Sequence, residues 1–217
     1  MSDDELRRTP RTQVVRNPKR ADYDREVVNE IIDATALCHV SYIIDGRPYV
    51  TPTLQWREGD TIYWHGSSAS RFLRQIVGKE VCMAITHFDG YVLARSAFHH
   101  SINYRSVMLF GEAIKIDGNE KNRLLDNFVD TLVPGRLKEL RAMTDQEAKA
   151  TTVFSMLIDE GSAKVRTGPP IDDDEDYELP IWAGGIPISQ IQHAPVPDPN
   201  NKPGLDIPKH VQDFKLR

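Results

Sequence analysis

The sequence of 217 residues is poor in cysteine and has no long apolar run. Its two cysteines, Cys38 and Cys82, lie in apolar stretches without metal-ligand spacing. We therefore expect two reduced core thiols, with one inter-strand disulfide as the alternative, and no metal site. No apolar stretch approaches the roughly 20 residues that span a bilayer. Because the polar start Met1–Glu5 leads into no apolar segment, we expect a cytoplasmic protein that is neither secreted nor bound to a membrane.

The chain also lacks an excess of positive charge. It carries 27 Lys and Arg residues against 32 Asp and Glu residues, a net charge of −5. Surfaces that bind nucleic acids are usually basic, so we expect no nucleic-acid partner. The sequence shows no internal repeat and no Walker-type phosphate loop. Apolar residues make up 40% of the chain, which is enough for a sizeable core and indicates a soluble globular protein.

Composition divides the chain into three parts. Residues 1–20 form a polar, arginine-rich arm, either solvated or strapped across a partner subunit, and residues 21–167 hold the patterned core. Residues 168–217 contain nine of the chain's fourteen prolines. This C-terminal extension cannot build a regular core and is predicted to wrap around the protein or to be disordered. We expect its acidic run, 172–176, to reach the basic arm.

The pattern of the core predicts strands joined by hairpins, with helices at the periphery. Asp45-Gly46 and Asp89-Gly90 are typical of two-residue hairpin turns. Pro48 and Pro52 predict an edge or a bulge in their strand, because proline cannot donate to the ladder. The predicted strands are 37–44, 47–56, 61–65, 81–88, 91–98, 103–116, 153–158 and 163–166, and the predicted helices are 25–36, 69–77, 120–132 and 136–148. The last helix is either continuous or broken at Thr144, where Thr144–Glu147 is typical of a capping box. We therefore expect a mainly β fold, an antiparallel barrel with accessory helices.

The segment Ile62–Arg74 is the most informative for function. A strand ends at His65, a loop of glycine and serines follows from Gly66, and the next helix carries Arg71 and Arg74. Free backbone N–H groups, serine hydroxyls and two arginines on one helix face favour the binding of a phosphate. An ordinary serine helix cap with surface arginines is the alternative interpretation.

Three motifs, in this order, resemble one known family. They are Gly46–Trp56, Tyr63–His65 followed by Ser70-Arg71, and Asn103–Gly111. Together they are similar to the FMN-binding split β-barrels of the pyridoxamine 5′-phosphate oxidase-like group, and in particular to the nitroimidazole-resistance (Nim) proteins. The resemblance covers about 10–167 and implies a six-stranded antiparallel split β-barrel. It also implies a homodimer with two FMN molecules, each held by both chains.

The resemblance implies a set of cofactor contacts. In the family, the strand that matches Thr51–Leu54 runs beside the flavin ring, and the residues that match Ser70 and Arg71 hold its phosphate. Many relatives carry a lysine directly after that arginine; this chain has Phe72 there, so we expect Arg74 to substitute. The implied cofactor-binding residues are Thr51, Pro52, Thr53, Leu54, His65, Gly66, Ser70, Arg71, Arg74, Tyr104, Ser106 and Trp182.

The last three of these residues come from the long strand and from the extension. Ser106 matches a polar residue that contacts the flavin in relatives, and Tyr104 shares its face by alternation. Trp182–Gly185 resembles the Trp-x-Gly that closes the flavin site of the vitamin B6 oxidases, so we expect Trp182 to cover the substrate side of the flavin. The arginine- and histidine-bearing segment that follows in those enzymes is missing here, as are their substrate-phosphate residues. This departure puts the B6 oxidase activity in doubt.

His65 is the residue that could take part in chemistry. It could donate a proton to a substrate that the flavin reduces, or only hydrogen-bond the ribityl chain. We expect an FMN-dependent oxidoreductase that acts on a small aromatic or nitro-bearing compound. The alternatives are a flavin- or haem-binding protein without turnover, used for storage, sensing or sequestration, and a pyridoxamine 5′-phosphate oxidase-type enzyme. The loop does not separate FMN from a deazaflavin with a phosphorylated tail.

Overall fold

The computed structural model describes residues 4–216. The first α-helix of the core begins at Arg25, as predicted. Asp24 caps α1 (Arg25–Asp33), and its side chain accepts hydrogen bonds from the N–H groups of Glu26 and Val27. Such a cap stabilises a helix by about 1 kcal/mol. The buried face of α1 consists of Val28, Ile31 and Ile32. These side chains belong to the main apolar core of the protein.

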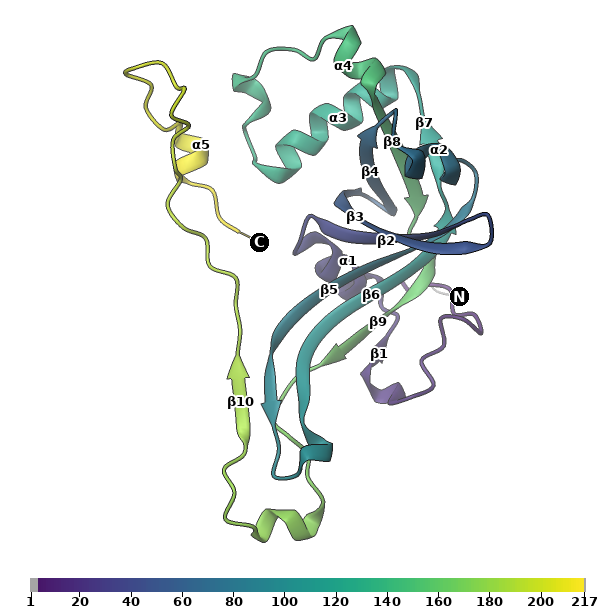
Figure 1. The fold of residues 1–217 in the computed structure, drawn as a ribbon, viewed down its shortest axis with the longest axis vertical. Helices are drawn as coiled ribbons and strands as arrows, with labels where there is room; N and C mark the ends of the chain where they lie inside the picture. Colours follow the sequence, from purple (N-terminus) through teal and green to yellow (C-terminus); the bar gives the residue numbers. More distant parts are fainter. Residues whose placement is uncertain (1–3, 217) are drawn as a thin grey trace.

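One antiparallel sheet follows and curls into the split barrel (Figure 1). Its strands within the described residues are β1 (Ala21–Asp22), β2 (Leu37–Ile44), β3 (Arg47–Glu58), β4 (Thr61–Ser67), β5 (Glu80–Leu93), β6 (Ser101–Glu112), β7 (Ile114–Ile116), β8 (Thr151–Leu157), β9 (Glu160–Arg166) and β10 (Gly184–Pro187). They lie in the order β1-β9-β6-β5-β2-β3-β4-β8-β7, and β10 pairs with β5. The fold is mainly β and antiparallel, as predicted, although short strands such as β1, β7 and β10 raise the number above six.

Strand β3 changes its pairing half-way along its length. Residues up to Leu54 pair with β2, whereas β4 pairs with β3 only from Gln55 onward. The half that begins at Arg47 therefore has one open edge. Pro48 and Pro52 lie in this half, where a missing N–H need not cost a ladder hydrogen bond, and the predicted edge is confirmed. The open edge is the split of the barrel.

The predicted hairpin turn at Asp89-Gly90 is wrong. Strand β5 continues through these residues and pairs with β6 on both sides of a register shift between Phe88 and Gly90. Arg105 of β6 binds the Asp89 carboxylate at 2.9 and 3.0 Å. A Cβ at Gly90 would lie 2.4 Å from the carbonyl oxygen of Ile186, so glycine lets β10 approach. The Asp-Gly pair forms a bulge here instead of a turn.

Helices cover one side of the barrel. Helix α2 (Arg71–Ile76) follows β4, and α3 (Gly118–Leu132) builds a second core cluster with the sheet. The predicted helix 136–148 is not continuous: the chain forms a 3-10 turn, η3 (Leu137–Glu139), and then starts α4 (Asp145–Ala150) at the predicted break after Thr144. The helix restarts because Thr144 and Glu147 form a capping box. The second core cluster contains Trp56, Leu124, Leu125, Phe128 and Val153.

The N-terminal arm binds its own barrel. Leu6 is fully buried, and Glu160, at the start of β9, leaves only 5% of its surface exposed. The Glu160 carboxylate accepts hydrogen bonds from the Thr9 hydroxyl at 2.6 Å and from Arg11 at 2.7 Å. Arg7 adds a contact of 3.1 Å. Within one chain, Arg7 and Arg11 are therefore bound by the barrel and do not meet the acidic run of the extension.

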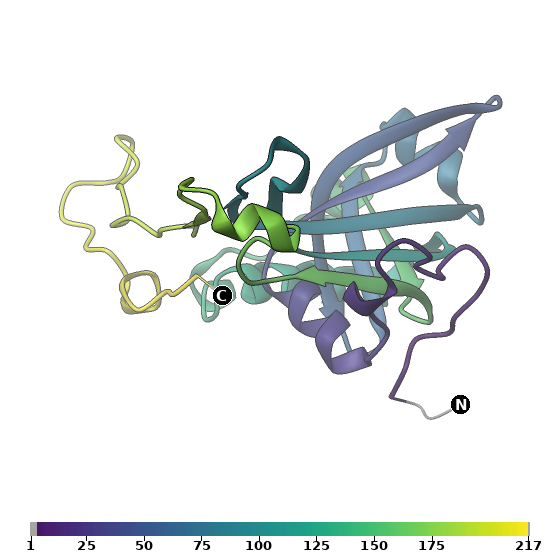
Figure 2. The same cartoon turned by 90° about the horizontal axis from the view of Figure 1, so that it is seen from below.

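The C-terminal extension runs along the outside of the protein and stands off from the barrel over part of its length (Figures 1 and 2). It forms a short turn, η4 (Asp174–Glu178), adds β10 to β5, and ends with α5 (Lys209–Gln212). Asp172 is its one buried residue within the described part of the chain, and its carboxylate binds Arg95 at 3.0 Å. The extension wraps the protein in an extended form, one of the two forms predicted.

Candidate functional site

The open edge of β3 and the end of β4 border the split of the barrel. Thr53 donates its hydroxyl to the carbonyl oxygen of His65 at 3.5 Å and so bridges the two strands. Thr51 shares a hydrogen bond of 3.0 Å with the hydroxyl of Tyr42. Leu54, where the edge ends, is exposed. The predicted cofactor strand therefore combines open backbone groups, which need polar partners, with an apolar side chain.

The loop after β4 is closed by the contact between Gly66 and α2. A Cβ at Gly66 would lie 3.0 Å from Leu73 Cδ1, so a side chain here would press on the helix. Ser70 occupies the N-cap of α2, but its side chain makes no capping hydrogen bond. The hydroxyl therefore remains free for a ligand. Because α2 has only six residues, the loop would attract an anion through its side chains more than through a helix dipole.

Arg71 and Arg74 are the exposed cations of α2. Arg71 leaves 64% of its side chain exposed, and its guanidinium lies 3.9 Å from the Asp45 carboxylate. It also lies 6.0 Å from the centre of the Tyr49 ring on β3. Arg74 makes no ion pair with any of residues 4–216. The structure thus brings Arg71 close to Asp45 and Tyr49 of the β2–β3 hairpin, with Ser70 directly before it, and the arrangement can hold an anionic group.

His65 packs beneath α3, within the second core cluster. Its ring centre lies 6.0 Å from that of Trp56 and 4.5 Å from that of Phe128. Nδ1 is enclosed, and neither ring nitrogen has a hydrogen-bond partner among the residues that the structure describes. Burial lowers the pKa of His65 below its ordinary value of 6.5 and so favours the neutral ring. A neutral imidazole with unpartnered nitrogens can ligate a metal ion or make new hydrogen bonds.

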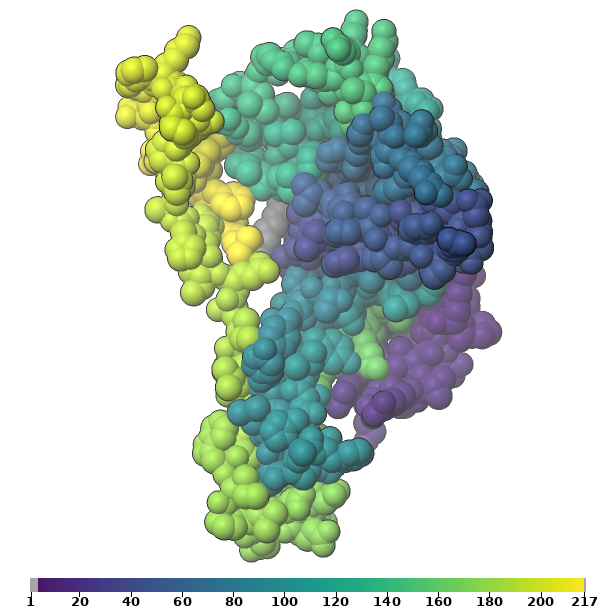
Figure 3. All heavy atoms as spheres, in the orientation of Figure 1, coloured from purple at the N-terminus to yellow at the C-terminus, as the bar shows by residue number. Residues whose placement is uncertain are grey.

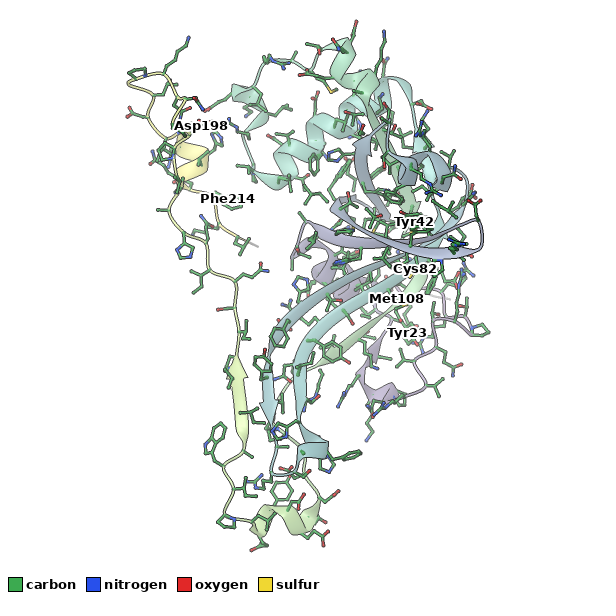
Figure 4. The ribbon with its side chains drawn as sticks, in the orientation of Figure 1. Tyr23, Tyr42, Cys82, Met108, Asp198 and Phe214 are labelled. Atoms are coloured by element: carbon green, nitrogen blue, oxygen red, sulfur yellow. The ribbon has the colours of Figure 1, made fainter. Side chains whose placement is uncertain are left out.

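A cavity of about 300 Å³ lies beside this cluster, between the end of α3, the α1–β2 connection and the C-terminal segment. Figure 3 shows the C-terminal end beside the region of α3, where a Cβ at Gly135 would lie 3.3 Å from His210 Cβ. Trp56, which contacts His65, lines the cavity, and so does Phe214, labelled in Figure 4. Three enclosed polar atoms of the lining lack partners in the described part of the chain: Gln55 Oε1, Trp56 Nε1 and His210 Nε2. Apolar walls with a few polar groups are typical of ligand sites.

Three predicted cofactor-binding residues, Tyr104, Ser106 and Trp182, do not lie near the loop after β4 within one chain. Tyr104 and Ser106 lie on β6, and three strands separate β6 from β4 in the sheet. Trp182 precedes β10, which lies at the opposite end of the molecule from α2 (Figure 1). Its indole is 70% exposed and lies over Gly184, where a Cβ would be 2.9 Å from the ring. A single chain therefore does not assemble the whole predicted site.

Residues 24–165 match the family described as pyridoxamine 5′-phosphate oxidase. The chain belongs to this family of flavin-binding split β-barrels. Among solved structures, it is 47% identical to the flavocytochrome Anf3 from Azotobacter vinelandii, with a TM-score of 0.93 over 96% of this chain and 98% of that chain. It is 36% identical to an FAD- and haem-binding protein from Mycobacterium smegmatis, with a TM-score of 0.85 over 88% of this chain and 95% of that chain.

Two further comparisons concern the Nim-like branch and curated proteins. A proposed 5-nitroimidazole antibiotic resistance protein from Bacteroides thetaiotaomicron shares 23% identity and a TM-score of 0.55, over 67% of this chain and 86% of that chain. At this identity the likeness shows the fold alone. A search among curated proteins found no match. Within residues 4–216, no helix is both long and apolar enough to cross a membrane.

Sequence reasoning missed the surroundings of His65. Trp56 ends one of the motifs that carry the family resemblance, so a signal for it was present. Phe128 lies in a correctly predicted helix, but nothing in the sequence indicates that it meets His65. His210 reaches the cavity from the far end of the extension, and no local pattern could reveal that contact.

Proposed function

We propose that this protein binds a flavin and a haem and transfers electrons between them, and that a ring nitrogen of His65 would bind the haem iron. The observation that carries the proposal is His65 itself: an enclosed, neutral imidazole whose nitrogens have no partner among the described residues. Support comes from the relatives named a flavocytochrome and an FAD- and haem-binding protein. Both matches extend well past residue 165, so both relatives share part of the C-terminal extension.

The phosphate loop would hold the flavin. The free Ser70 hydroxyl and the Arg71 guanidinium can bind a phosphate, and Arg74 adds charge. The open backbone of Thr51–Leu54 can hydrogen-bond the polar edge of a flavin ring. When bound, a flavin supplies one- and two-electron transfer. These residues suit any phosphorylated flavin; FMN, as the family resemblance implies, and FAD, as in one relative's name, are both within the proposal.

The pKa of His65 decides between its two roles. Because burial lowers this pKa, little of the ring is protonated at pH 7, which weakens it as a proton donor. The same neutral state is the one that binds iron. This favours haem ligation over the role of His65 as an acid in the reduction of a small aromatic or nitro-bearing compound. The aromatic rings of Trp56 and Phe128 would exclude water from the ligated face and fix the ring.

We also propose that the working form is a homodimer. Tyr104, Ser106 and Trp182 can reach a flavin at the phosphate loop only if a second chain supplies them. Exposed apolar side chains on the sheet, such as Val50 and Met108, offer a surface for that second chain. Light scattering of the cofactor-loaded protein should give about twice the chain mass of 24.6 kDa. A monomer that keeps its cofactors would contradict this arrangement.

The absorbance spectrum of the purified protein tests the function. We expect flavin bands together with a Soret band, and mass spectrometry of the released chromophores should identify the flavin. His65→Ala should remove the Soret band and keep the flavin. Arg71→Ala should keep the haem and weaken flavin binding by roughly 10- to 100-fold, as expected for one charge-assisted contact. His193→Ala, on the exposed extension, is the control for the loss of a histidine.

Two outcomes would contradict the proposed function. One is a protein that binds flavin but takes up no haem from solution. The other is an unchanged Soret band in His65→Ala, which would move the haem ligand to another residue. Loss of both cofactors in His65→Ala together with a lower melting temperature would indicate misfolding, and His65→Gln, which keeps the side chain polar, would then replace it.

A further inference from the structure

Arg166, the last residue of β9, carries a charge that the described protein leaves without a counter-ion. It is only 7% exposed. Its guanidinium donates to neutral acceptors, the Asn103 side-chain oxygen and the carbonyl oxygen of Pro169 at 3.3 Å. Nε is enclosed and has no partner. A buried cation without an anion costs free energy, so such groups in proteins are normally paired.

Two more cations, Arg20 and Lys164, lie near Arg166. Burial and the positive charge of Arg20 lower the pKa of Arg166. Lys164 lies two residues earlier on the same face of β9. Within residues 4–216, none of these three side chains lies within ion-pair distance of a carboxylate. The nearby Asp22 accepts a hydrogen bond from the backbone of Asp24 at 2.9 Å instead.

These cations border the predicted flavin contacts. In the register of β6 and β9, Tyr104 lies opposite Arg166, and Ser106 lies opposite Lys164. All four side chains therefore lie on one face of the sheet, the face that points away from the apolar core. Met108, labelled in Figure 4, shares this face and is exposed. Tyr104, Ser106 and Lys164 are half-buried, so this face is partly open to a ligand beside the buried Arg166.

We propose that Arg166, Lys164 and Arg20 form an oxyanion subsite that binds a phosphate or carboxylate group of a ligand lying on this face. The subsite is distinct from the phosphate loop, from which three strands separate it within one chain. An oxyanion fits this subsite because Arg166 and Lys164 share one face of β9, the charge of Arg20 acts on Arg166, and no carboxylate of residues 4–216 pairs with any of the three. The source of the anion, a phosphate of a dinucleotide flavin or a haem propionate, rests on the proposed function.

Binding of pyrophosphate to the full chain, measured by titration calorimetry, tests the subsite without reference to either cofactor. We expect Arg166→Gln, Lys164→Gln and Arg20→Gln each to weaken pyrophosphate binding by about tenfold, the effect of one charge-assisted contact. Arg16→Gln, an exposed arm arginine without an ion pair among the described residues, is the charge-matched control and should change little. The double variant Arg71→Ala/Arg74→Ala removes both cations of the phosphate loop, so the binding that it retains reports mainly the new subsite.

Two further binding experiments identify the source of the oxyanion. If a flavin dinucleotide supplies it, Arg166→Gln should reduce the preference for FAD over FMN. If haem supplies it, the same variant should weaken haem binding but not the binding of haem dimethyl ester, which lacks the carboxylates. If Arg166→Gln does not fold, both experiments are repeated with Lys164→Gln, a change at a half-buried surface residue.

The inference is overturned if none of the three substitutions weakens pyrophosphate binding more than Arg16→Gln does. It is also overturned if all pyrophosphate binding disappears in Arg71→Ala/Arg74→Ala. Failure of the proposed function is a different result: a protein without haem or flavin could still bind pyrophosphate through Arg166. If every variant lost cofactor binding but Arg71→Ala/Arg74→Ala kept pyrophosphate binding, the subsite would stand and the proposed function would fail.

Discussion

The two extensions of the barrel differ in how the protein holds them. The N-terminal arm places Leu6 in the main core and binds its arginines to Glu160, which is nearly inaccessible to water. The C-terminal extension is about twice as long, yet within the described residues its one buried side chain is Asp172. It touches the protein mainly through β10 and through the segment that lines the cavity.

This difference indicates that the N-terminal arm serves mainly the stability of the fold and the C-terminal extension mainly its function. An arm that contributes to the core and neutralises a buried carboxylate is part of the folded unit. An extension with exposed apolar side chains, such as Trp182 and Val196, contributes little to folding unless something covers it. We therefore expect damage to the arm to lower stability, and damage to the extension to alter ligand binding.

Glu160→Gln should have the largest effect on stability. The amide cannot neutralise Arg7 and Arg11, although these arginines are half exposed and regain some hydration. We expect a loss of about 2–3 kcal/mol in the free energy of unfolding and a decrease of roughly 5–10 °C in melting temperature. Glu5→Gln, which breaks the exposed pair with Arg8, should cost less than about 1 kcal/mol. Equal decreases in the two variants would show that the arm is not part of the folded unit.

Acid should weaken the same contact. The arginines and the Thr9 hydroxyl hold the pKa of Glu160 at about 2, below the ordinary value of 4.5. A carboxyl with a lowered pKa stabilises the fold above the pKa of the unfolded chain, and this contribution is lost as the pH falls toward the folded value. We expect the melting temperature of the wild type to decrease between pH 4.5 and pH 2 more steeply than that of Glu160→Gln. Parallel pH profiles would exclude this role for Glu160.

Removal of residues 168–217 should change stability less than Glu160→Gln does. The shortened chain loses the Asp172–Arg95 pair, worth about 1–2 kcal/mol, but keeps the whole barrel and the arm. It also loses His210 and Phe214, which line the cavity beside Trp56. We expect a folded, flavin-binding protein that releases haem faster, measured by transfer of haem to apomyoglobin. Unchanged haem release would show that the extension has no part in the haem site.

The sequence predicted what local rules determine. The start of α1 at Arg25 and the β2–β3 hairpin depend on residues close together in the chain, and both were predicted correctly. The open edge of β3 followed from two prolines. The same rules failed at Asp89-Gly90. There, Arg105 binds Asp89 and β10, about ninety residues further along the chain, pairs with Gly90, so the residues form a bulge and not a turn.

The site was predictable to a similar degree. The phosphate loop lies in one short segment, Gly66–Arg74, and the structure places its residues together. The partners of His65 come from β3 and α3, and those of Arg166 from β6 and the residues after β9, so no local pattern contains them. Trp182 belongs to neither group: within one chain it lies at the opposite end of the molecule from α2, and only the proposed second chain would bring it to the flavin.

Trp182→Ala should have the smallest effect on stability and so isolates the function of the extension. The indole is exposed in a single chain, so its loss should change the free energy of unfolding by no more than about 0.5 kcal/mol. If a partner subunit carries it onto the flavin, the indole stacks on the ring and quenches its emission. We then expect Trp182→Ala to raise flavin fluorescence and iodide quenching and to broaden the range of substrates. Phe98→Ala, which removes another exposed aromatic ring, controls for general effects. Identical flavin emission and quenching in both variants would show that Trp182 does not cover the flavin.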